Sequence, residues 1–323
     1  MPLSQIVSAS IEDGAVAPVD LSSVAQYTGF KNRIINGAVG ISQRVAVNTA
    51  VAVSNGAGGT FGPDRWWGYT GTLSLWNQYQ VTTGAYDFPY AWRVQRIAGQ
   101  TSTSFIYYGQ TIETNNCIDL AGQTVTISFY ATAGANYSGG AANVQLLTGT
   151  VADQGTSSLN SGTWTGFATP ISQTFTPTTT RTRFTFTGTI GSTVQEISFR
   201  FYWGGSGTAG ANDYIDITGV QLEKGVTATS FDYRPYGTEL AMCQRYYESN
   251  NTAVGGTSVS FIVNTAGYFP SRGFVVTKRA TPTMTITPTA GSGAAVSADP
   301  TGFYQSTANS AAAGSYWTAS AEL

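Results

Sequence analysis

The chain has 323 residues, no histidine and a formal net charge of −2. Charged residues make up 10% of it, far below the ~25% of an average soluble protein. So small a charge gives no long-range attraction for nucleic acid or anionic lipid, and no apolar stretch approaches the ~20 residues of a membrane helix. We therefore expect neither nucleic-acid binding nor membrane insertion.

The residue types also restrict catalysis. The absence of histidine excludes Ser-His-Asp and Cys-His catalysis and every His-ligated metal site. Two cysteines, Cys117 and Cys243, are too few for a zinc site, and we predict that both are free, buried thiols. A pair of carboxylates acting as a glycosidase remains as the common enzymatic alternative. Its candidates are Asp64, Asp87, Glu113, Asp119, Asp153, Glu196, Asp213, Asp216 and Glu223.

Residues 1–28 contain few aromatic side chains, and Gly14 and Pro18 would interrupt any long helix there. Two interpretations stay open. The segment is either an ordinary flexible terminus or an arm that becomes ordered against a neighbouring protein.

From Phe30 to Lys224 the sequence shows the two-residue periodicity of β-strands, most clearly in Thr124–Tyr130 and Arg183–Thr187. The expected strands are Arg33–Ile35, Thr72–Leu75, Ala91–Arg96, Phe105–Gln110, Thr124–Ala131, Asn143–Leu147, Gln173–Phe175, Arg183–Thr187, Glu196–Trp203 and Asp213–Leu222. The expected loops are rich in Gly, Asn and Ser and include Ser54–Gly59, Gly134–Ala142, Ser157–Gly162 and Gly204–Ala211. Short strands without intervening helices predict a two-sheet β-sandwich.

A connecting segment, residues 220–237, leads to a short helix for which Thr238 is the expected cap, and then to a strand over Gln244–Glu248. The remaining strand candidates are Val259–Val263, Arg272–Val276, Thr283–Ile286, Gly302–Gln305 and Ser315–Ala319. A segment of this size forms only a small core. We therefore expect the last domain, residues 238–323, to be stabilised by trimerisation or by packing on the sandwich.

Aromatic residues are dense between Trp66 and Trp92. Their rings can stack on the apolar faces of sugars while neighbouring polar groups bind the hydroxyls. Most aromatic residues of a β-sandwich nevertheless belong to its core, and we assign the Asp64-Arg65-Trp66 motif to the core. Aromatic residues on loops are the better candidates for glycan contacts. They are Tyr79, Tyr86, Tyr137 and Trp164.

Several short motifs resemble, in the same order, those of bacteriophage tail fibre and host-adsorption proteins. They are the opening GFKNRIING (29–37), Asp64-Arg65-Trp66, the run VQLEKG…TSFDYRPYGTELAMCQRYYE from Val220 to Glu248, and the ending Tyr316–Leu323. The resemblance implies a jelly-roll domain related to carbohydrate-binding modules over residues 29–237. It also implies a homotrimer, with the arm 1–28 attached to other virion tail proteins.

The same resemblance implies a structural calcium ion where the opening and closing strands meet, although no cofactor is required. Asn36 and Asp216 are the candidate ligands. Calcium needs six to eight oxygen ligands, and the alternative is that Asp216 is simply an exposed strand residue.

These observations favour a phage tail fibre (adsorption) protein that binds host surface glycan without cleaving it. No secretory signal is visible at the N-terminus, so we expect the protein to be assembled in the host cytoplasm as part of the virion. Three copies would multiply a weak single-site affinity. The alternatives are a purely structural virion fibre or decoration protein and a polysaccharide-depolymerising tailspike.

Overall fold

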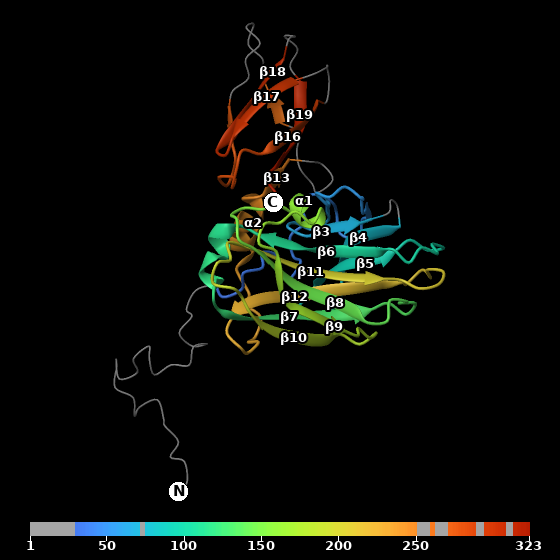
Figure 1. The fold of residues 1–323 in the computed structure, drawn as a ribbon. Helices are drawn as coiled ribbons and strands as arrows, with labels where there is room; N and C mark the ends of the chain where they lie inside the picture. Colours follow the sequence, from blue (N-terminus) through green and yellow to red (C-terminus); the bar gives the residue numbers. More distant parts are fainter. Residues whose placement is uncertain (1–29, 72–74, 251–258, 262–270, 289–293, 308–312) are drawn as a thin grey trace, which may run out of the picture.

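The computed structural model describes residues 30–71, 75–250, 259–261, 271–288, 294–307 and 313–323. Figure 1 shows these residues as a β-sandwich with a smaller group of strands at one end. The expected arm, residues 1–28, and most of the expected strand Thr72–Leu75 lie outside the described residues.

Two six-stranded antiparallel sheets form the sandwich, and this confirms the predicted all-β jelly-roll fold. Sheet A contains, in spatial order, β1 (Val51–Ala52), β4 (Trp76–Thr82), β5 (Tyr90–Arg96), β12 (Tyr214–Lys224), β7 (Thr124–Ala133) and β10 (Thr182–Thr189). Sheet B contains β2 (Thr60–Phe61), β3 (Trp67–Thr70), β6 (Phe105–Ile112), β11 (Glu196–Gly204), β8 (Ala142–Gly149) and β9 (Ala168–Phe175).

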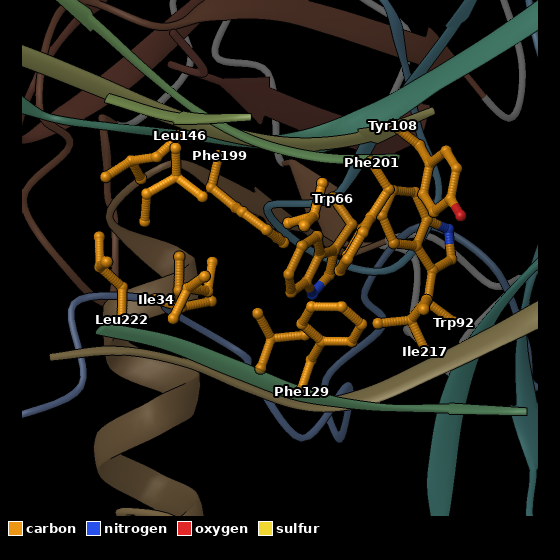
Figure 2. Close-up of a cluster of buried hydrophobic side chains, with 14 of the residues drawn as sticks. Ile34, Trp66, Trp92, Tyr108, Phe129, Leu146, Phe199, Phe201, Ile217 and Leu222 are labelled. Atoms are coloured by element: carbon orange, nitrogen blue, oxygen red, sulfur yellow. The ribbon is translucent and has the colours of Figure 1, made fainter. Parts of the chain in front are cut away.

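Aromatic side chains fill the space between the two sheets (Figure 2). Phe129 of β7 meets Phe201 of β11 with ring centroids 4.6 Å apart. Trp66 enters the same core from the loop before β3, and its ring centroid lies 5.0 Å from that of Trp92. Its indole N–H donates to the carbonyl oxygen of Asn36 at 3.0 Å. The assignment of Trp66 to the core is therefore confirmed.

The expected strand Arg33–Ile35 is wrong, because this segment leads into a turn. Asn36 has a φ of 58°, in the left-handed region that ends an extended conformation. Gly37 follows it, and a Cβ atom at this position would lie 2.2 Å from the carbonyl oxygen of Val220. The amide of Val220 in turn donates to the carbonyl oxygen of Gly37 at 2.9 Å. A tight turn therefore joins the opening segment to β12.

Strands β3 and β4 and a short helix, α1 (Thr156–Asn160), form where the sequence pattern did not indicate them. Helix α1 lies in the expected loop Ser157–Gly162. Its apolar residue Leu159 packs with Trp67 of β3 and Trp164 on the outside of sheet B. An apolar anchor therefore packs this Gly- and Ser-rich segment against sheet B.

The C-terminal strands form two small antiparallel sheets at one end of the sandwich (Figure 1). The first contains β13 (Tyr247–Ser249), β19 (Ala313–Ser320) and β14 (Val259–Phe261), with β16 (Thr283–Pro288) also paired to β19. The second contains β15 (Arg272–Gly273), β18 (Gly302–Thr307) and β17 (Ala294–Asp299). β17 was not expected, and the expected strand Arg272–Val276 is reduced to the two residues of β15.

Helix α2 (Tyr236–Gln244) connects the sandwich to these sheets. It begins after Pro235, two residues before the expected cap Thr238, and the expected domain boundary between residues 237 and 238 falls within it. Leu240 and Cys243 of the helix pack in a cluster that also contains Leu323. The end of the described chain therefore returns to the junction between the two parts.

A buried ion network holds this junction. The carboxylate of Glu322 accepts hydrogen bonds from Arg65 Nη1 and, at 2.8 Å, from Arg44 Nη2. Arg65 Nη2 also donates to the carbonyl oxygen of Thr111 at 2.5 Å, and its guanidinium lies 3.6 Å from the ring centroid of Tyr246. Burial acts to lower the pKa of Arg65, but Glu322 and Tyr246 outweigh it and raise that pKa.

Both cysteines are free and buried, as expected. Burial raises the pKa of each thiol, so neither is a reactive thiolate. Within the described residues, no helix is both long and apolar enough to cross a membrane.

Replacing Trp66 by alanine removes a fully buried indole from the core. We expect W66A to lower the free energy of unfolding by about 3–5 kcal/mol, measured by denaturant titration. Tyr86→Ala is the control, because Tyr86 is fully exposed and its removal should change that free energy by less than about 0.5 kcal/mol. Equal effects of the two substitutions would contradict the core assignment.

Glu196 is a buried carboxyl group at the start of β11. Its Oε2 accepts a hydrogen bond from Thr114 Oγ1 at 2.8 Å, whereas its Oε1 has no partner in the described part of the chain. Burial raises the pKa of Glu196 to about 8. The folded protein therefore holds a proton that the unfolded chain releases near pH 4.3.

Because the folded state binds this extra proton, stability should fall as pH rises from about 4.3 to about 8, by up to about 1.4 kcal/mol per pH unit. Glu196→Gln, which keeps the shape of the neutral acid, should remove this decline and match the wild type near pH 4. Chemical denaturation at a series of pH values measures both curves. Curves that stay parallel across this range would show that Glu196 is ionised in the folded protein.

Candidate functional site

The outer face of sheet B is only partly covered. Trp67, Leu147, Leu159 and Trp164 form an apolar cluster beneath α1 and the segment that follows it. This cluster covers one part of the face. The remaining part carries aromatic side chains that no other element covers completely.

Three tyrosines form a ladder across this part of the face. Tyr69 of β3 is paired in register with Tyr107 of β6, which is paired with Tyr202 of β11. The ring centroids of Tyr69 and Tyr107 lie 6.3 Å apart, and those of Tyr107 and Tyr202 lie 5.3 Å apart. Phe105 stands beside the ladder on β6 and is 48% exposed. The rings therefore form a continuous row across three strands.

A groove of about 480 Å³ runs between this ladder and the segment around α1. It is lined by Tyr69, Gly71, Tyr107, Leu159, Asn160, Gly162, Phe167 and Arg200. Phe167 contributes a ring that is 51% exposed. We call this site the sheet B groove.

Arg200 of β11 is the charged residue of the sheet B groove. Its Nε donates at 2.9 Å to Oε1 of Gln145, the residue of β8 that is paired in register with Arg200. Its guanidinium lies 4.9 Å from the ring centroid of Tyr107. Partial burial lowers the pKa of Arg200, against the opposing effects of Tyr107 and Tyr202. The groove therefore offers apolar ring faces together with fixed hydrogen-bond donors.

None of the residues that line the groove is an aspartate or glutamate. The carboxylates considered for glycosidase chemistry are mostly held by arginines elsewhere. The ion pairs are Asp64–Arg44, Asp87–Arg181, Glu113–Arg245, Asp119–Arg33, Asp153–Arg279, Asp213–Arg96 and Asp216–Arg93. The lining of the sheet B groove therefore supplies no carboxyl group for general acid catalysis.

A second groove, of about 360 Å³, lies on the outer face of sheet A. Arg93 Nε and Nη2 each bond one carboxylate oxygen of Asp216 at 2.8 Å, and Tyr214 stacks on the guanidinium at 3.5 Å. Arg181, which also lines it, is paired with Asp87. Arg93, Asp216 and Arg181 are thus all paired with an opposite charge, so this groove has fewer charged groups free for a ligand than the sheet B groove.

The four predicted glycan contacts do not come together. Tyr79 lies on sheet A opposite Arg93, and Tyr86 is fully exposed in the turn between β4 and β5. Tyr137 stacks on Trp203 with centroids 4.7 Å apart. Trp164 is buried beneath α1, where its indole N–H donates to the carbonyl oxygen of Gly155 at 3.0 Å. Of the four, Trp164 supports the sheet B groove without reaching its surface.

Asn36 and Asp216 have separate sets of partners. Asn36 Oδ1 accepts from the amide of Ile41 at 3.0 Å, and its Nδ2 donates to the carbonyl oxygens of Ile41 and Asp64. Asp216 is held by Arg93. Within the described residues, no group of three or more acidic, His or Cys side chains could hold a metal ion. These two residues therefore do not fit a shared calcium site, and structural calcium stays a prediction from the resemblance.

The ladder residues Tyr107 and Tyr202, and Arg200 beside them, were not predicted as site residues, because they lie on strands and the predicted contacts were aromatic residues of loops. A usable signal was present in Phe105-Ile106-Tyr107-Tyr108, which is apolar at every position. In a strand buried on one face only, apolar residues alternate with polar ones, so an uninterrupted run of aliphatic and aromatic residues indicates a second apolar face. Ile106 and Tyr108 do face the core, and Phe105 and Tyr107 lie on the outside.

No protein-family model and no curated protein matches the chain. Solved structures show a distant similarity. A CBM4 module is 21% identical over 59% of this chain and 98% of its own, with a TM-score of 0.35. The C-terminal family 22 carbohydrate-binding module of Clostridium thermocellum Xyn10B is 12% identical over 58% and 100%, with a TM-score of 0.34.

The enzymatically active domain of tailspike protein 4 from bacteriophage CBA120 is 13% identical over 60% of this chain and 21% of its own, with a TM-score of 0.37. Similarities of this size carry no conclusion about function.

Asp216→Asn should lower the free energy of unfolding by roughly 1–3 kcal/mol, because it leaves Arg93 without its charged partner. Since Arg93 already occupies the carboxylate of Asp216, we expect a calcium chelator to change the thermal transitions of the wild type and of Asp216→Asn by the same amount. Calorimetry with and without chelator measures this. A transition lowered by the chelator and restored by added calcium would establish a calcium site formed by other residues.

Proposed function

We propose that the sandwich is a non-catalytic glycan-binding module whose site is the sheet B groove. The observation that carries the proposal is the ladder of Tyr69, Tyr107 and Tyr202 beside a groove whose lining residues include no carboxylate. A sugar has apolar C–H faces, which stack on aromatic rings, and hydroxyl groups, which form directional hydrogen bonds with a few polar side chains.

Exposure supports the same proposal. Phe105 and Phe167 keep about half of their surface in solvent beside the ladder. Large apolar side chains that gather on one face of a soluble protein indicate a surface that becomes covered by a ligand or partner. Arg200 and Asn160 line the groove beside these rings and supply hydrogen-bond donors for hydroxyl or acidic groups.

The finer proposal is that the chain is a phage tail fibre protein that attaches the virion to host surface glycan. Its support is the ordered set of short motifs and the low-charge, hydroxyl-rich composition. The same resemblance supports a homotrimer attached through residues 1–28 to other tail proteins, and mass measurement of the purified protein tests the trimer. Several shallow sites on one particle would give high avidity from weak single contacts.

Two substitutions on opposite faces test the glycan site. Tyr107→Ala should weaken binding to host surface polysaccharide by about tenfold or more, because the ladder loses its central ring. Tyr79→Ala is the matched control, since Tyr79 is a half-buried strand tyrosine on the outer face of sheet A. Binding is measured by calorimetry, and polymer length is followed in the same samples.

The other outcomes identify the alternatives. Binding lost with Tyr79→Ala and kept with Tyr107→Ala would move the site to sheet A. Shortening of the polymer would support a depolymerising tailspike. No binding to polysaccharide from a confirmed host would support a structural fibre or decoration protein.

A further inference from the structure

Arg200 differs from most arginines of this protein in its electrostatic partners. In the part of the chain that the structure describes, nine arginines form an ion pair with a carboxylate: Arg33, Arg44, Arg65, Arg93, Arg96, Arg181, Arg234, Arg245 and Arg279. Among the described residues, no carboxylate forms an ion pair with Arg200, and none is among the groups that shift its pKa. Its charge is therefore held in place without a counter-ion.

The position of Arg200 is fixed although its charge is unpaired. The Nε–H donates to Gln145, and the guanidinium lies 4.9 Å from the ring centroid of Tyr107, the central ring of the ladder. No hydrogen bond from the described residues occupies Nη1 or Nη2. Partial burial disfavours the charged form and lowers the pKa of Arg200. A cation that is partly removed from water and has no carboxylate partner is unfavourable in the free protein, and an anionic ligand would relieve this.

We infer that the sheet B groove selects an acidic sugar, with Arg200 binding its carboxylate while the sugar ring stacks on Tyr107. This inference rests on the proposed glycan site and adds the chemical class of its ligand. The two free N–H groups at the end of a planar guanidinium match the two oxygens of a carboxylate. A uronic acid carries that carboxylate on the ring itself, so one residue can satisfy both contacts.

The contrast with the sheet A groove supports the assignment. There, Arg93 is bonded through two nitrogens to Asp216, so the site already contains its own carboxylate. The sheet B groove has the same arginine-and-tyrosine arrangement, with Arg200 beside Tyr107, but it has no acid among its lining residues. On sheet B, a ligand carboxylate would pair with Arg200 as the carboxylate of Asp216 pairs with Arg93 on sheet A.

The test uses the full chain and uronic-acid-containing bacterial polysaccharides, each compared with the same polymer after reduction of its carboxyl groups. We expect the wild type to bind the acidic polymers at least about tenfold more tightly than the reduced ones. Increasing the salt concentration should weaken binding to the acidic polymers and leave binding to the reduced polymers unchanged. A sulfated form of each reduced polymer separates carboxylate recognition from general attraction to anions, and equal binding to it would overturn the carboxylate assignment.

Arg200→Gln should remove the preference, so that this variant binds the acidic and the reduced polymers with equal affinity, whereas Arg200→Lys should keep part of the preference. Arg181→Gln is the control, because it makes the same change in net charge on the opposite face. Tyr107→Ala should weaken binding to both sets. Equal wild-type affinity for acidic and reduced polymers would overturn this inference and leave the glycan site standing, while no binding to any polymer would overturn both.

Discussion

The buried guanidinium of Arg65 is the constraint on which the arrangement of the molecule depends. An ionised group removed from water costs several kcal/mol unless it is fully paired. Arg65 obtains its partners from three distant parts of the chain: the carbonyl oxygen of Thr111, the carboxylate of Glu322 and the ring of Tyr246. Any rotation of the C-terminal strands against the sandwich would separate these groups. The network therefore specifies one relative position of the two parts.

The same network extends to the wall of the sheet B groove. Thr111 accepts the hydrogen bond of Arg65 through its carbonyl oxygen, and its hydroxyl lies 2.9 Å from that of Thr156, the first residue of α1. Gly155, just before α1, lies against the backbone of Leu323. Helix α1 is thus held between the sandwich and the end of the described chain. A segment of only five helical residues can in this way form a stable side of a binding site.

Much of the fold followed from local pattern, because polar and apolar residues alternate in Thr124–Tyr130 of β7 and in Arg183–Thr187 of β10. The turn at Asn36 and helix α1 did not, since both depend on contacts with residues far away in the sequence. The candidate site was harder to predict from the sequence than the fold. Which face a residue occupies depends on strand register, and a shift of one residue exchanges the two faces. Sequence alone therefore showed Tyr107 as one more aromatic residue, and favoured Trp164, which proves to be buried.

The tyrosine ladder runs across the strands of sheet B and not along them. Neighbouring strands are about 4.8 Å apart, so the first and third ring positions are separated by roughly 10 Å, the length of about two linked sugar residues. A polysaccharide lying on the ladder would cross the sheet and leave it on both sides. The protein would then read a short internal unit of the polymer, so each chain of host polysaccharide would present as many attachment points as it has repeats.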